Sequence, residues 1–251
     1  MLALLDSDLI VYRIGFTTED VDAALACIRA KETVEKILSE VNATSYKLFL
    51  TEENDPKAFR KGIYPEYKAH RTKPRPKWYK ELRDYLQVEY GAEVCYEIEA
   101  DDALGIAQTT NNMTTDPDNW FFPDGTLALA AGQRSIICSI DKDLLQIPGL
   151  HYNFVKLEFS EVSLMEGLRT FYTQLLTGDS ADNIKGVWKV GPKKAEQILA
   201  GADTEQEMFN RVRDTYANDE EMLMNGRCLW VWKKANDDYQ QHWNRLTTTQ
   251  G

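Results

Sequence analysis

Short, mainly apolar runs alternate along the first part of the chain with longer stretches in which apolar and polar residues mix. An apolar run of this length is typical of a buried strand. The runs that fit are 2–5, 46–50, 94–98 and 136–140. The mixed stretches predict helices at 17–41, 76–90 and 100–109. Strands that alternate with helices form a parallel sheet with helices on both faces, so we predict an α/β fold.

The ends of these helices have sequence signals. Thr17 or Thr18 can cap the first helix. Pro76 can begin the second helix and Gly91 can end it. The apolar face of the first helix would carry Val21, Leu25, Ile28, Leu38 and Val41.

The pattern changes after residue 162. Helices are predicted over 163–177 and from Pro192 to about residue 200, and the remainder is helical and mixed. Its tryptophans, Trp230, Trp232 and Trp243, would pack it onto the body. We therefore divide the chain into a core, 1–162, and a helical lobe, 163–251. Within the core, residues 111–132 are rich in Asn, Thr, Asp, Pro and Gly and predict a long loop.

An acidic residue follows each predicted strand. Asp6, Glu52, Glu99 and Asp141 come after the first to the fourth strand in turn. Ligands of parallel sheets bind beyond the carboxyl ends of the strands, so these side chains should meet at one edge. In extended backbone, residues two apart point to the same face. By spacing or proximity, further acids become candidates for the same edge: Asp8, Asp101, Asp102, Asp143 and Asp179, with Asp182 beyond.

Carboxylates held this close repel one another and raise each other's pKa. A bound divalent cation makes sense of the arrangement, because Mg²⁺ prefers oxygen ligands. Two ions roughly 3.5–4 Å apart suit in-line hydrolysis of a phosphodiester. We therefore predict a centre for two Mg²⁺ (or Mn²⁺) ions rather than a chance gathering of surface acids.

The charge of the chain is unevenly distributed. The net charge of −11 argues at first against a nucleic-acid partner. Residues 57–83, however, contain ten Lys or Arg and two acids, a local balance of +8 that leaves −19 for the remainder. A basic segment on an acidic protein indicates an oriented electrostatic footprint. A solvated charged loop is the alternative.

A glycine-containing hairpin is predicted between the helix over 163–177 and the helix that begins at Pro192. It contains Gly186 and Gly191, and Lys193 and Lys194 follow it. Backbone N–H groups at the start of a helix can hold a phosphate, and the two lysines add positive charge. The hairpin therefore predicts a second phosphate-binding element.

Composition excludes other classes. Hydrophobic residues make up 43% of 251 residues, enough for a core. The chain contains no run of eighteen apolar residues, so no membrane span is predicted. The first residues lack the features of a signal peptide. Four scattered cysteines are typical of buried free thiols in a reducing compartment. We expect a cytoplasmic protein with no membrane partner.

Five motifs carry a resemblance to a known family. In chain order they are Leu5-Asp6-Ser7-Asp8 with Tyr12-Arg13; Phe59-Arg60-Lys61 with 64–71; Glu99-Ala100-Asp101-Asp102; Ser139-Ile140-Asp141-Lys142-Asp143; and 178–183 with Gly186 and Gly191. The chain resembles the 5′ nuclease superfamily: the 5′→3′ exonuclease domain of bacterial DNA polymerase I, flap endonucleases and, most closely, the bacteriophage 5′→3′ exonucleases.

The resemblance implies a PIN-like nuclease core with two metal sites and a basic helical arch at about 57–90. It also implies a helix-hairpin-helix lobe that grips duplex DNA, often with a K⁺ ion in the hairpin. Asp6, Glu99 and Asp101 match the ligands of one metal. The residues that match the other site are Asp102, Asp141, Asp143 and Asp179, with Asp182 nearby. Which acid serves which ion stays open.

The resemblance also assigns cations to the substrate. Lys68 and Arg71 match residues at the base of the arch that contact the scissile phosphate, and Arg13 matches a further phosphate-binding arginine. Fixed cations there stabilise the charge that develops on the phosphoryl oxygens. The residues expected to bind DNA are Arg60, Lys61, Tyr67, Gly186, Gly191, Lys193 and Lys194.

The sequence departs from the family at three points. The family has an Asp after the second strand, where Glu52 or Glu53 stands nearest here. Asp8 is an additional acid, and residues 111–132 are longer than in the polymerase-linked relatives. The aromatic residues that either stack on unpaired flap bases or pack internally are Tyr64, Tyr67 and Trp78.

Together these features predict a divalent-metal-dependent 5′→3′ exonuclease or flap endonuclease that acts on 5′ flaps and nicked or double-stranded DNA. The resemblance implies a role in DNA replication with replication proteins as partners, and the host cytoplasm if a bacteriophage encodes the chain. RNase H-like removal of RNA primers from RNA–DNA hybrids is an alternative that the same site supports. A non-catalytic, structure-specific DNA-binding protein is another, although such a binder should lose acids that repel DNA.

Overall fold

A six-stranded sheet forms the centre of the fold. The computed structural model describes residues 1–112 and 134–248, so nearly all of the predicted loop 111–132 lies outside the described residues. The strands are β1 (Leu2–Asp6), β2 (Ser45–Thr51), β3 (Glu93–Cys95), β4 (Ser135–Cys138), β5 (Gly149–Asn153) and β6 (Glu158–Val162). Their order is β3-β2-β1-β4-β5-β6. The four predicted strands, β1 to β4, are parallel, as predicted; β5 is parallel to them as well, and β6 is the antiparallel strand of this sheet.

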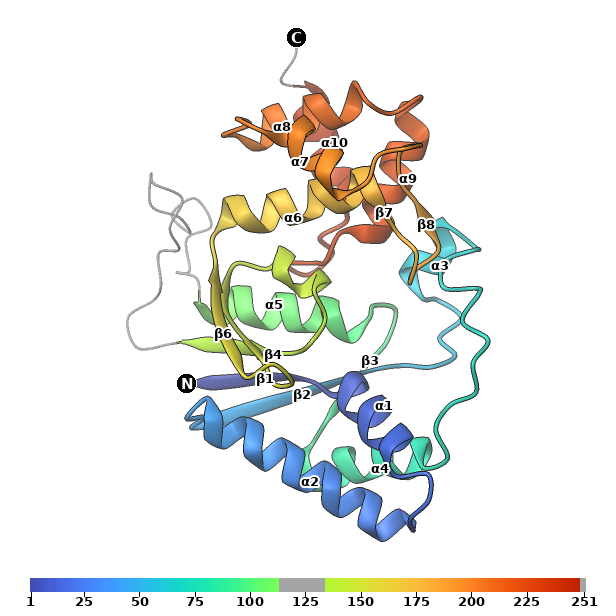
Figure 1. The fold of residues 1–251 in the computed structure, drawn as a ribbon, viewed down its shortest axis with the longest axis vertical. Helices are drawn as coiled ribbons and strands as arrows, with labels where there is room; N and C mark the ends of the chain where they lie inside the picture. The colour runs from blue at the N-terminus through green and yellow to red at the C-terminus, as the bar shows by residue number, and fades with distance from the viewer. Residues whose placement is uncertain (113–133, 249–251) are drawn as a thin grey trace.

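Helices cover both faces of the sheet (Figure 1). On one face lie α1 (Ser7–Thr17), α2 (Ala23–Glu40) and α4 (Tyr79–Tyr90). They share a buried cluster with the sheet that includes Leu5, Ile10 and Leu82. On the other face lies α5 (Ala100–Asn112), in a second cluster around Leu4 and Leu104. Strand β1 is therefore buried from both sides, as its apolar run predicted.

The start predicted for the helix 17–41 is wrong, and its predicted apolar face is right only at its C-terminal end, where Leu38 and Val41 pack in the core. Asp6 caps α1 directly after β1, and α2 begins later, capped by Asp22. The buried face of α2 carries Ala26, Ala30, Val34 and Ile37, whereas Leu25 and Ile28 are 38% and 50% exposed. Small alanines let α2 lie close to its neighbours, and a search for large aliphatic residues overlooks such a face.

Three other predicted boundaries are confirmed, whereas α4 begins at Tyr79 and not at Pro76. Helix α4 ends at Gly91, whose φ of 65° is the left-handed conformation that glycine adopts readily. Ser163 caps α6 (Leu164–Thr177) in a capping box with Glu166. Pro192 is the first residue of α7 (Pro192–Leu199). The hairpin of β5 and β6 was not predicted.

The second half of the chain is a helical lobe (Figure 1). After α6 a small antiparallel hairpin, β7 (Gly178–Asp179) and β8 (Ile184–Lys185), leads to α7. Three more helices follow: α8 (Glu205–Arg213), α9 (Asp219–Leu229) and α10 (Tyr239–Thr248). The predicted packing of the tryptophans is confirmed, since Trp230, Trp232 and Trp243 are at most 8% exposed.

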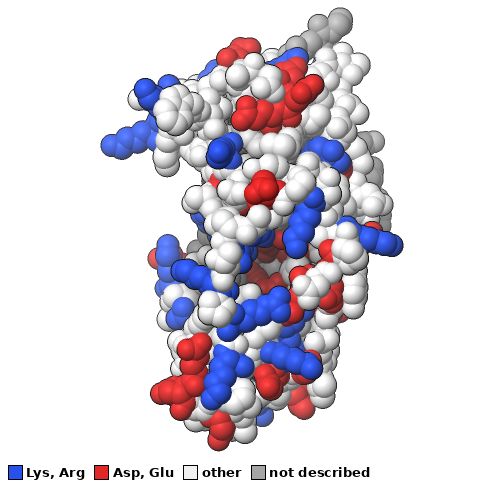
Figure 2. Space-filling view, turned by 90° about the vertical axis from the view of Figure 1, so that its right-hand side faces the viewer, with Lys and Arg blue, Asp and Glu red and all other residues white. Residues whose placement is uncertain are grey.

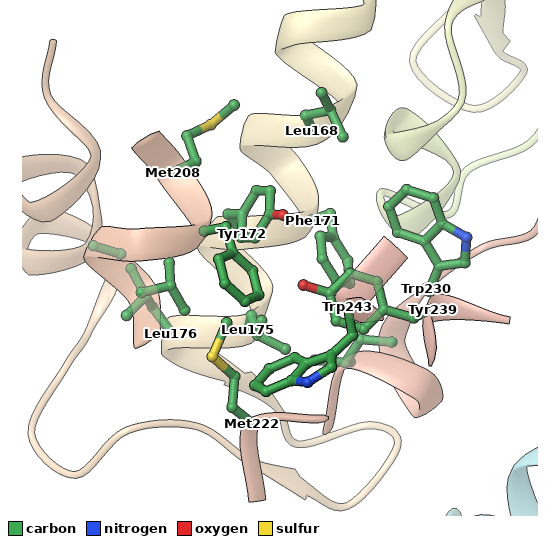
Figure 3. Close-up of a cluster of buried hydrophobic side chains, with 14 of the residues drawn as sticks. Leu168, Phe171, Tyr172, Leu175, Leu176, Met208, Met222, Trp230, Tyr239 and Trp243 are labelled. Atoms are coloured by element: carbon green, nitrogen blue, oxygen red, sulfur yellow. The ribbon is translucent and has the colours of Figure 1, made fainter. Parts of the chain in front are cut away.

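The core of the lobe is rich in aromatic residues (Figure 3). The rings of Phe171, Trp230 and Tyr239 lie within 6 Å of one another, with edge-to-face or tilted geometry. The short helix α3 (Phe59–Ile63), from the basic segment, also packs against this cluster. Within 1–112 and 134–248, no helix is long and apolar enough to cross a membrane.

Candidate metal centre and nucleic-acid interface

The carboxyl ends of β1 and β4 hold the first acids of the site. Asp6 is the last residue of β1 and, at 3% exposure, is almost completely buried. Its Oδ1 accepts a hydrogen bond from the N–H of Leu9, and its Oδ2 accepts one from Ser139 Oγ at 2.8 Å. The same Ser139 Oγ accepts the N–H of Asp141 at 3.0 Å. One serine therefore links the acids of two neighbouring strands.

The extended backbone predicted for the acids two residues apart is wrong, although each pair does lie close together. Asp8 and Asp101 lie in the first turns of α1 and α5, and Asp143 begins a short 3₁₀ helix, η2 (Asp143–Gln146). Asp8 accepts hydrogen bonds from the N–H of Thr51 and from Arg83, so it ties α1 to its neighbours. The carboxylates gather because strands end at one edge, not because of the two-residue period.

One group of acids surrounds Asp101. Its carboxylate has no hydrogen-bond partner among those found in the described residues, and its charged neighbours include Asp6, Asp141 and Glu99. Burial and the charges of Asp6 and Asp141 raise the pKa of Asp101 well above its usual range. Burial, with the charge of Asp8, raises the pKa of Asp6 to about 7. Asp6 and Asp101 are therefore short of positive charge.

A second group surrounds Asp143. Burial and the charges of Asp141 and Asp179 raise the pKa of Asp143 to about 7. Asp179 is 4% exposed, and its Oδ2 has no hydrogen bond, although Lys142 Nζ lies 3.5 Å away. Asp141 is a neighbour in both groups. The acids thus form two adjoining groups with one shared member.

The donor set fits hard divalent cations. The donors are carboxylate oxygens, the ligands that Mg²⁺ and Mn²⁺ take, and a buried Asp179 oxygen is left without a hydrogen bond. In the part of the chain that the structure describes, no three acidic, His or Cys side chains already converge at ligand distance. Like charges repel, and a cation would draw them together. Figure 2 shows a hollow with acidic residues at its floor and Lys and Arg around it.

Lys68 lies directly against the first group. Its Nζ is 2.6 Å from Glu99 Oε1, and Tyr67 donates its hydroxyl to Glu99 Oε2 at 2.9 Å. Burial alone would raise the pKa of Glu99, but Lys68 and Arg60 outweigh it and lower the pKa to about 2. Lys68 has a φ of 54°, unusual for a residue with a side chain. Glu99 is therefore a charged acid held by a basic partner.

Arg71 binds the hairpin that carries Asp179. It donates to Asp182 Oδ1 at 2.7 Å and to the carbonyl of Ala181, while Asp182 Oδ2 lies 2.8 Å from the Tyr67 hydroxyl and shares its one proton with Glu99. Asp182 is thus occupied by arch cations. The Arg71 side chain remains 53% exposed, so more than half of it faces solvent.

The structure contradicts the assignment of Asp102 to a metal and of Arg60 to DNA. Asp102 is completely buried, and both its oxygens accept hydrogen bonds from the Arg60 guanidinium. Arg60 is 5% exposed and also donates to the carbonyls of Cys228 and Trp230. The charges of Arg60 and Asp102 therefore neutralise each other in the protein interior. Neither side chain reaches a ligand.

The segment Cys228–Trp232, which we term the strap, contacts both Arg60 and Asp102. Sequence reasoning missed this segment. Its Trp232 N–H donates to Asp102, and its Val231 N–H to Gln146. Gln146 also donates to Gln174, which donates to Asp143. The strap therefore holds Asp102 directly and reaches Asp143 through Gln146 and Gln174. Nothing in the local sequence signals a contact across more than 80 residues.

The aromatic residues of the arch pack internally. Tyr67, predicted to bind DNA, is 3% exposed, so that prediction is wrong. Tyr64 packs against the lobe, and Trp78 packs against the sheet and donates to the carbonyl of Val21. Helix α4, included in the predicted arch, also packs on the sheet. Packing rather than stacking explains all three aromatic residues.

The acids after β2 face arginines. Glu53 pairs with Arg75 and lies 3.7 Å from Arg83, whereas Glu52 accepts the N–H of Glu53. Glu53 is therefore already neutralised, and of the two only Glu52 is without a basic partner among the ion pairs of the described residues.

The remaining predicted contacts lie on the surface or in the hairpin. Arg13 and Lys61 are exposed, on α1 and α3, and Lys193 and Lys194 are exposed on α7. Gly186 is required by packing, because a Cβ there would lie 2.2 Å from the backbone N of Gly178. Gly191 caps α7 and faces open space.

A mostly parallel sheet with acidic groups at its carboxyl edge, beside a lobe with a hairpin between helices, is the architecture expected of a PIN-like core. Sequence comparison agrees, although no family model matches the chain. The 5′-3′ exonuclease of Buchnera aphidicola is 25% identical over 239 residues, 88% of this chain and 75% of its own length. Flap endonuclease Xni of Shewanella sp. (strain ANA-3) is 28% identical over 190 residues, 70% and 66% of the two chains.

Solved structures share the fold. The T5 5′-exonuclease with bound zinc superposes with a TM-score of 0.68 at 14% identity over 91% of this chain and 88% of that one. The bacteriophage T5 flap endonuclease in complex with DNA and metal ions has a TM-score of 0.58 at 12% identity, with 98% of both chains covered. In sequence the chain is similar to 5′-3′ exonucleases and flap endonucleases, and in fold it is similar to the T5 5′-exonuclease.

Proposed function

We propose that the chain is a divalent-metal-dependent 5′ nuclease that hydrolyses DNA phosphodiesters, both as a 5′→3′ exonuclease and as a flap endonuclease. The observation that carries the proposal is the pair of acidic groups that share Asp141 and adjoin the cations Lys68 and Arg71. The sequence relatives named as 5′-3′ exonuclease and flap endonuclease support it.

Two ions, Mg²⁺ or Mn²⁺, are part of the proposal. The acids around Asp101 would hold one ion and those around Asp143 the other, with Asp141 between them. Bound there, the ions would supply Lewis acidity to a water molecule and to the scissile phosphate. The metal-bound structures of the T5 protein support such sites. Asp102 is left out of the ligand set, because Arg60 occupies it.

The cations of the arch would orient the scissile phosphate. Although burial opposes it, the charge of Glu99 raises the pKa of Lys68, so the side chain is an ammonium at neutral pH. With the charge of Glu99 offset by a bound ion, the Lys68 ammonium would be able to contact a phosphoryl oxygen of the substrate. Arg71, more exposed, can add a second contact in the same way. Charge that develops on the phosphate is then stabilised by groups already in place.

DNA is the proposed polymer. The basic segment 57–83 borders the acids, and the hairpin lysines lie beyond them on the lobe. The DNA complex of the T5 enzyme supports this partner. The finer parts of the proposal are a preference for 5′ flaps or nicks, a K⁺ ion in the hairpin, an association with replication proteins, a bacteriophage origin and a cytoplasmic location. RNA–DNA hybrids remain the alternative substrate.

A labelled 5′-flap duplex with Mg²⁺ tests the proposal, with Asp141→Asn as the control. Wild type should release the flap, and the variant should not. A matched RNA–DNA hybrid run in parallel ranks the two substrates. If wild type binds the flap duplex but never cuts it under any divalent metal, the chain is a binding protein and the nuclease proposal fails.

A further inference from the structure

The tip of the loop between β8 and α7 carries an exposed tryptophan. Trp188 is 84% exposed, more than any other large hydrophobic residue in 1–112 and 134–248. The other tryptophans in those ranges are buried or half-buried. A single exposed hydrophobic residue needs no explanation by itself. The surroundings of Trp188 make it informative.

The loop that carries Trp188 is held in one shape. The N–H of Val187 donates to the carbonyl of Leu176 at 2.8 Å, and the N–H of Val190 donates back to Val187 at 3.0 Å. Val190 is buried in the core of the lobe. Lys189 has a φ of 60°, a conformation that costs free energy for a residue with a side chain. The indole is therefore presented outward by a fixed turn.

Positive charge surrounds the indole. Lys185, Lys189, Lys193 and Lys194 are exposed, and residues 184–195 contain no acid. Lys189 Nζ lies 5.8 Å from the centroid of the Trp188 ring. None of these lysines belongs to an ion pair among those found in the described residues. A basic surface with an aromatic centre, on a chain of net charge −11, fits a polyanion that also offers apolar surface.

The tip is rigidly joined to the acidic groups. Strand β7 carries Asp179, and the backbones of Gly178 and Gly186 approach so closely that a Cβ on either would clash. Residues 186–188 follow directly. A duplex held at Trp188 is thus held at a fixed distance from Asp179.

We propose that Trp188 packs into the minor groove of the DNA duplex beside the cleavage site, while the four lysines contact the flanking phosphates. The inference rests on the proposed function and names a specificity residue within it. The minor groove of B-form DNA is narrow, about 6 Å, whereas that of an A-form helix is wide and shallow. An inserted indole contacts both walls only in the narrow minor groove of B-form DNA. Trp188 therefore favours DNA over an RNA–DNA hybrid.

Fluorescence anisotropy in EDTA tests the contact without cleavage. The probes are a labelled DNA duplex, an RNA–DNA hybrid of the same sequence and a single-stranded oligonucleotide. Trp188→Ala should weaken duplex binding about tenfold, with a smaller loss on the hybrid and none on the single strand. Trp188→Phe should recover part of the loss. Phe159→Ala, which removes a 59% exposed aromatic residue from β6, is the matched control and should bind like wild type.

Two results overturn the proposal: equal loss on all three probes, or unchanged duplex affinity in Trp188→Ala. Cleavage of the DNA duplex with Mg²⁺ separates this failure from failure of the nuclease proposal. Trp188→Ala should raise KM about tenfold and leave kcat unchanged, since the indole touches no reacting atom. If wild type binds DNA without cutting it, the nuclease proposal fails. The binding measurements in EDTA still decide whether Trp188 contacts the duplex.

Discussion

Asp101 and Asp102 are neighbours in the sequence, yet the fold treats their charges in opposite ways. Asp102 is completely buried and is neutralised by a bidentate bond to Arg60. Asp101 lies among Asp6, Glu99 and Asp141, so its pKa is raised by burial and by their charges. A structural carboxylate has its counter-charge inside the protein. A carboxylate whose counter-charge is missing indicates that the counter-charge comes from a ligand.

The same contrast separates the strap from the acidic edge. The strap satisfies Arg60, Asp102 and Gln146 with backbone groups and holds them in one place. At the edge, Asp179 retains an oxygen without a hydrogen bond. Rigid, satisfied contacts therefore lie beneath the site, and unsatisfied oxygens face it.

The largest expected effect is on catalysis. Asp101→Asn and Asp141→Asn should each reduce flap cleavage with Mg²⁺ by 10³-fold or more, on the order of 4 kcal/mol, because each removes a ligand charge. Stability without metal should be unchanged or higher, since a repelling charge is removed. Cleavage rates and thermal unfolding in EDTA measure the two effects. Loss of activity accompanied by unfolding would mean that these acids are structural.

Asp102→Asn should instead act on stability. It removes the charge of the bidentate partner of the buried Arg60 guanidinium and leaves only Glu99, 3.6 Å away, and breaking a buried pair costs about 3–5 kcal/mol. Urea unfolding measures the loss. The double variant Arg60→Met with Asp102→Leu should be less destabilised than the two single variants summed. Strict additivity would show that the two side chains do not interact as described.

Lys68→Ala should lower the rate of cleavage by about 10²–10³-fold, the range seen when one stabilising donor is removed from an active site. Removing the ammonium 2.6 Å from Glu99 should also raise the pKa of Glu99 from about 2. Single-turnover rates and NMR titration of the Glu99 carboxyl carbon follow the two effects. Lys73→Ala, an exposed lysine on the same segment, serves as the control. An equal loss of cleavage rate in both variants would mean that Lys68 acts only through its positive charge and has no specific role in the site.

The smallest effect is on the pH dependence of stability. The pKa values of Asp6 and Asp143 are raised from 3.8 to about 7 in the folded state. The folded protein therefore binds more protons than the unfolded chain between about pH 4 and 7, so its stability falls as the pH rises through that window. Thermal unfolding in EDTA should show this slope, and Mg²⁺ should abolish it. A stability that rises from pH 4 to 7 in EDTA would contradict it.

The strand ends of the fold were predictable because burial imposes a clear pattern. The apolar runs at β1, β2 and β4 located the edge where Asp6 and Asp141 meet. The pattern could not separate Asp101 from Asp102, since both are acids at the start of one helix and only tertiary contact with Arg60 distinguishes them. The same limit applies to Arg60 and Tyr67, whose burial depends on the strap and the lobe. Gln146 and Gln174 carry no local signal.

The comparison of Asp101 with Asp102 is tested most directly by Mn²⁺ binding, measured by isothermal titration calorimetry on wild type, Asp101→Asn and the Arg60→Met, Asp102→Leu double variant. We expect Asp101→Asn to bind Mn²⁺ at least tenfold more weakly than wild type, whereas the double variant, at a temperature where it is folded, keeps wild-type affinity. Wild-type affinity in Asp101→Asn together with lost binding in the folded double variant would contradict the assignment of the two acids.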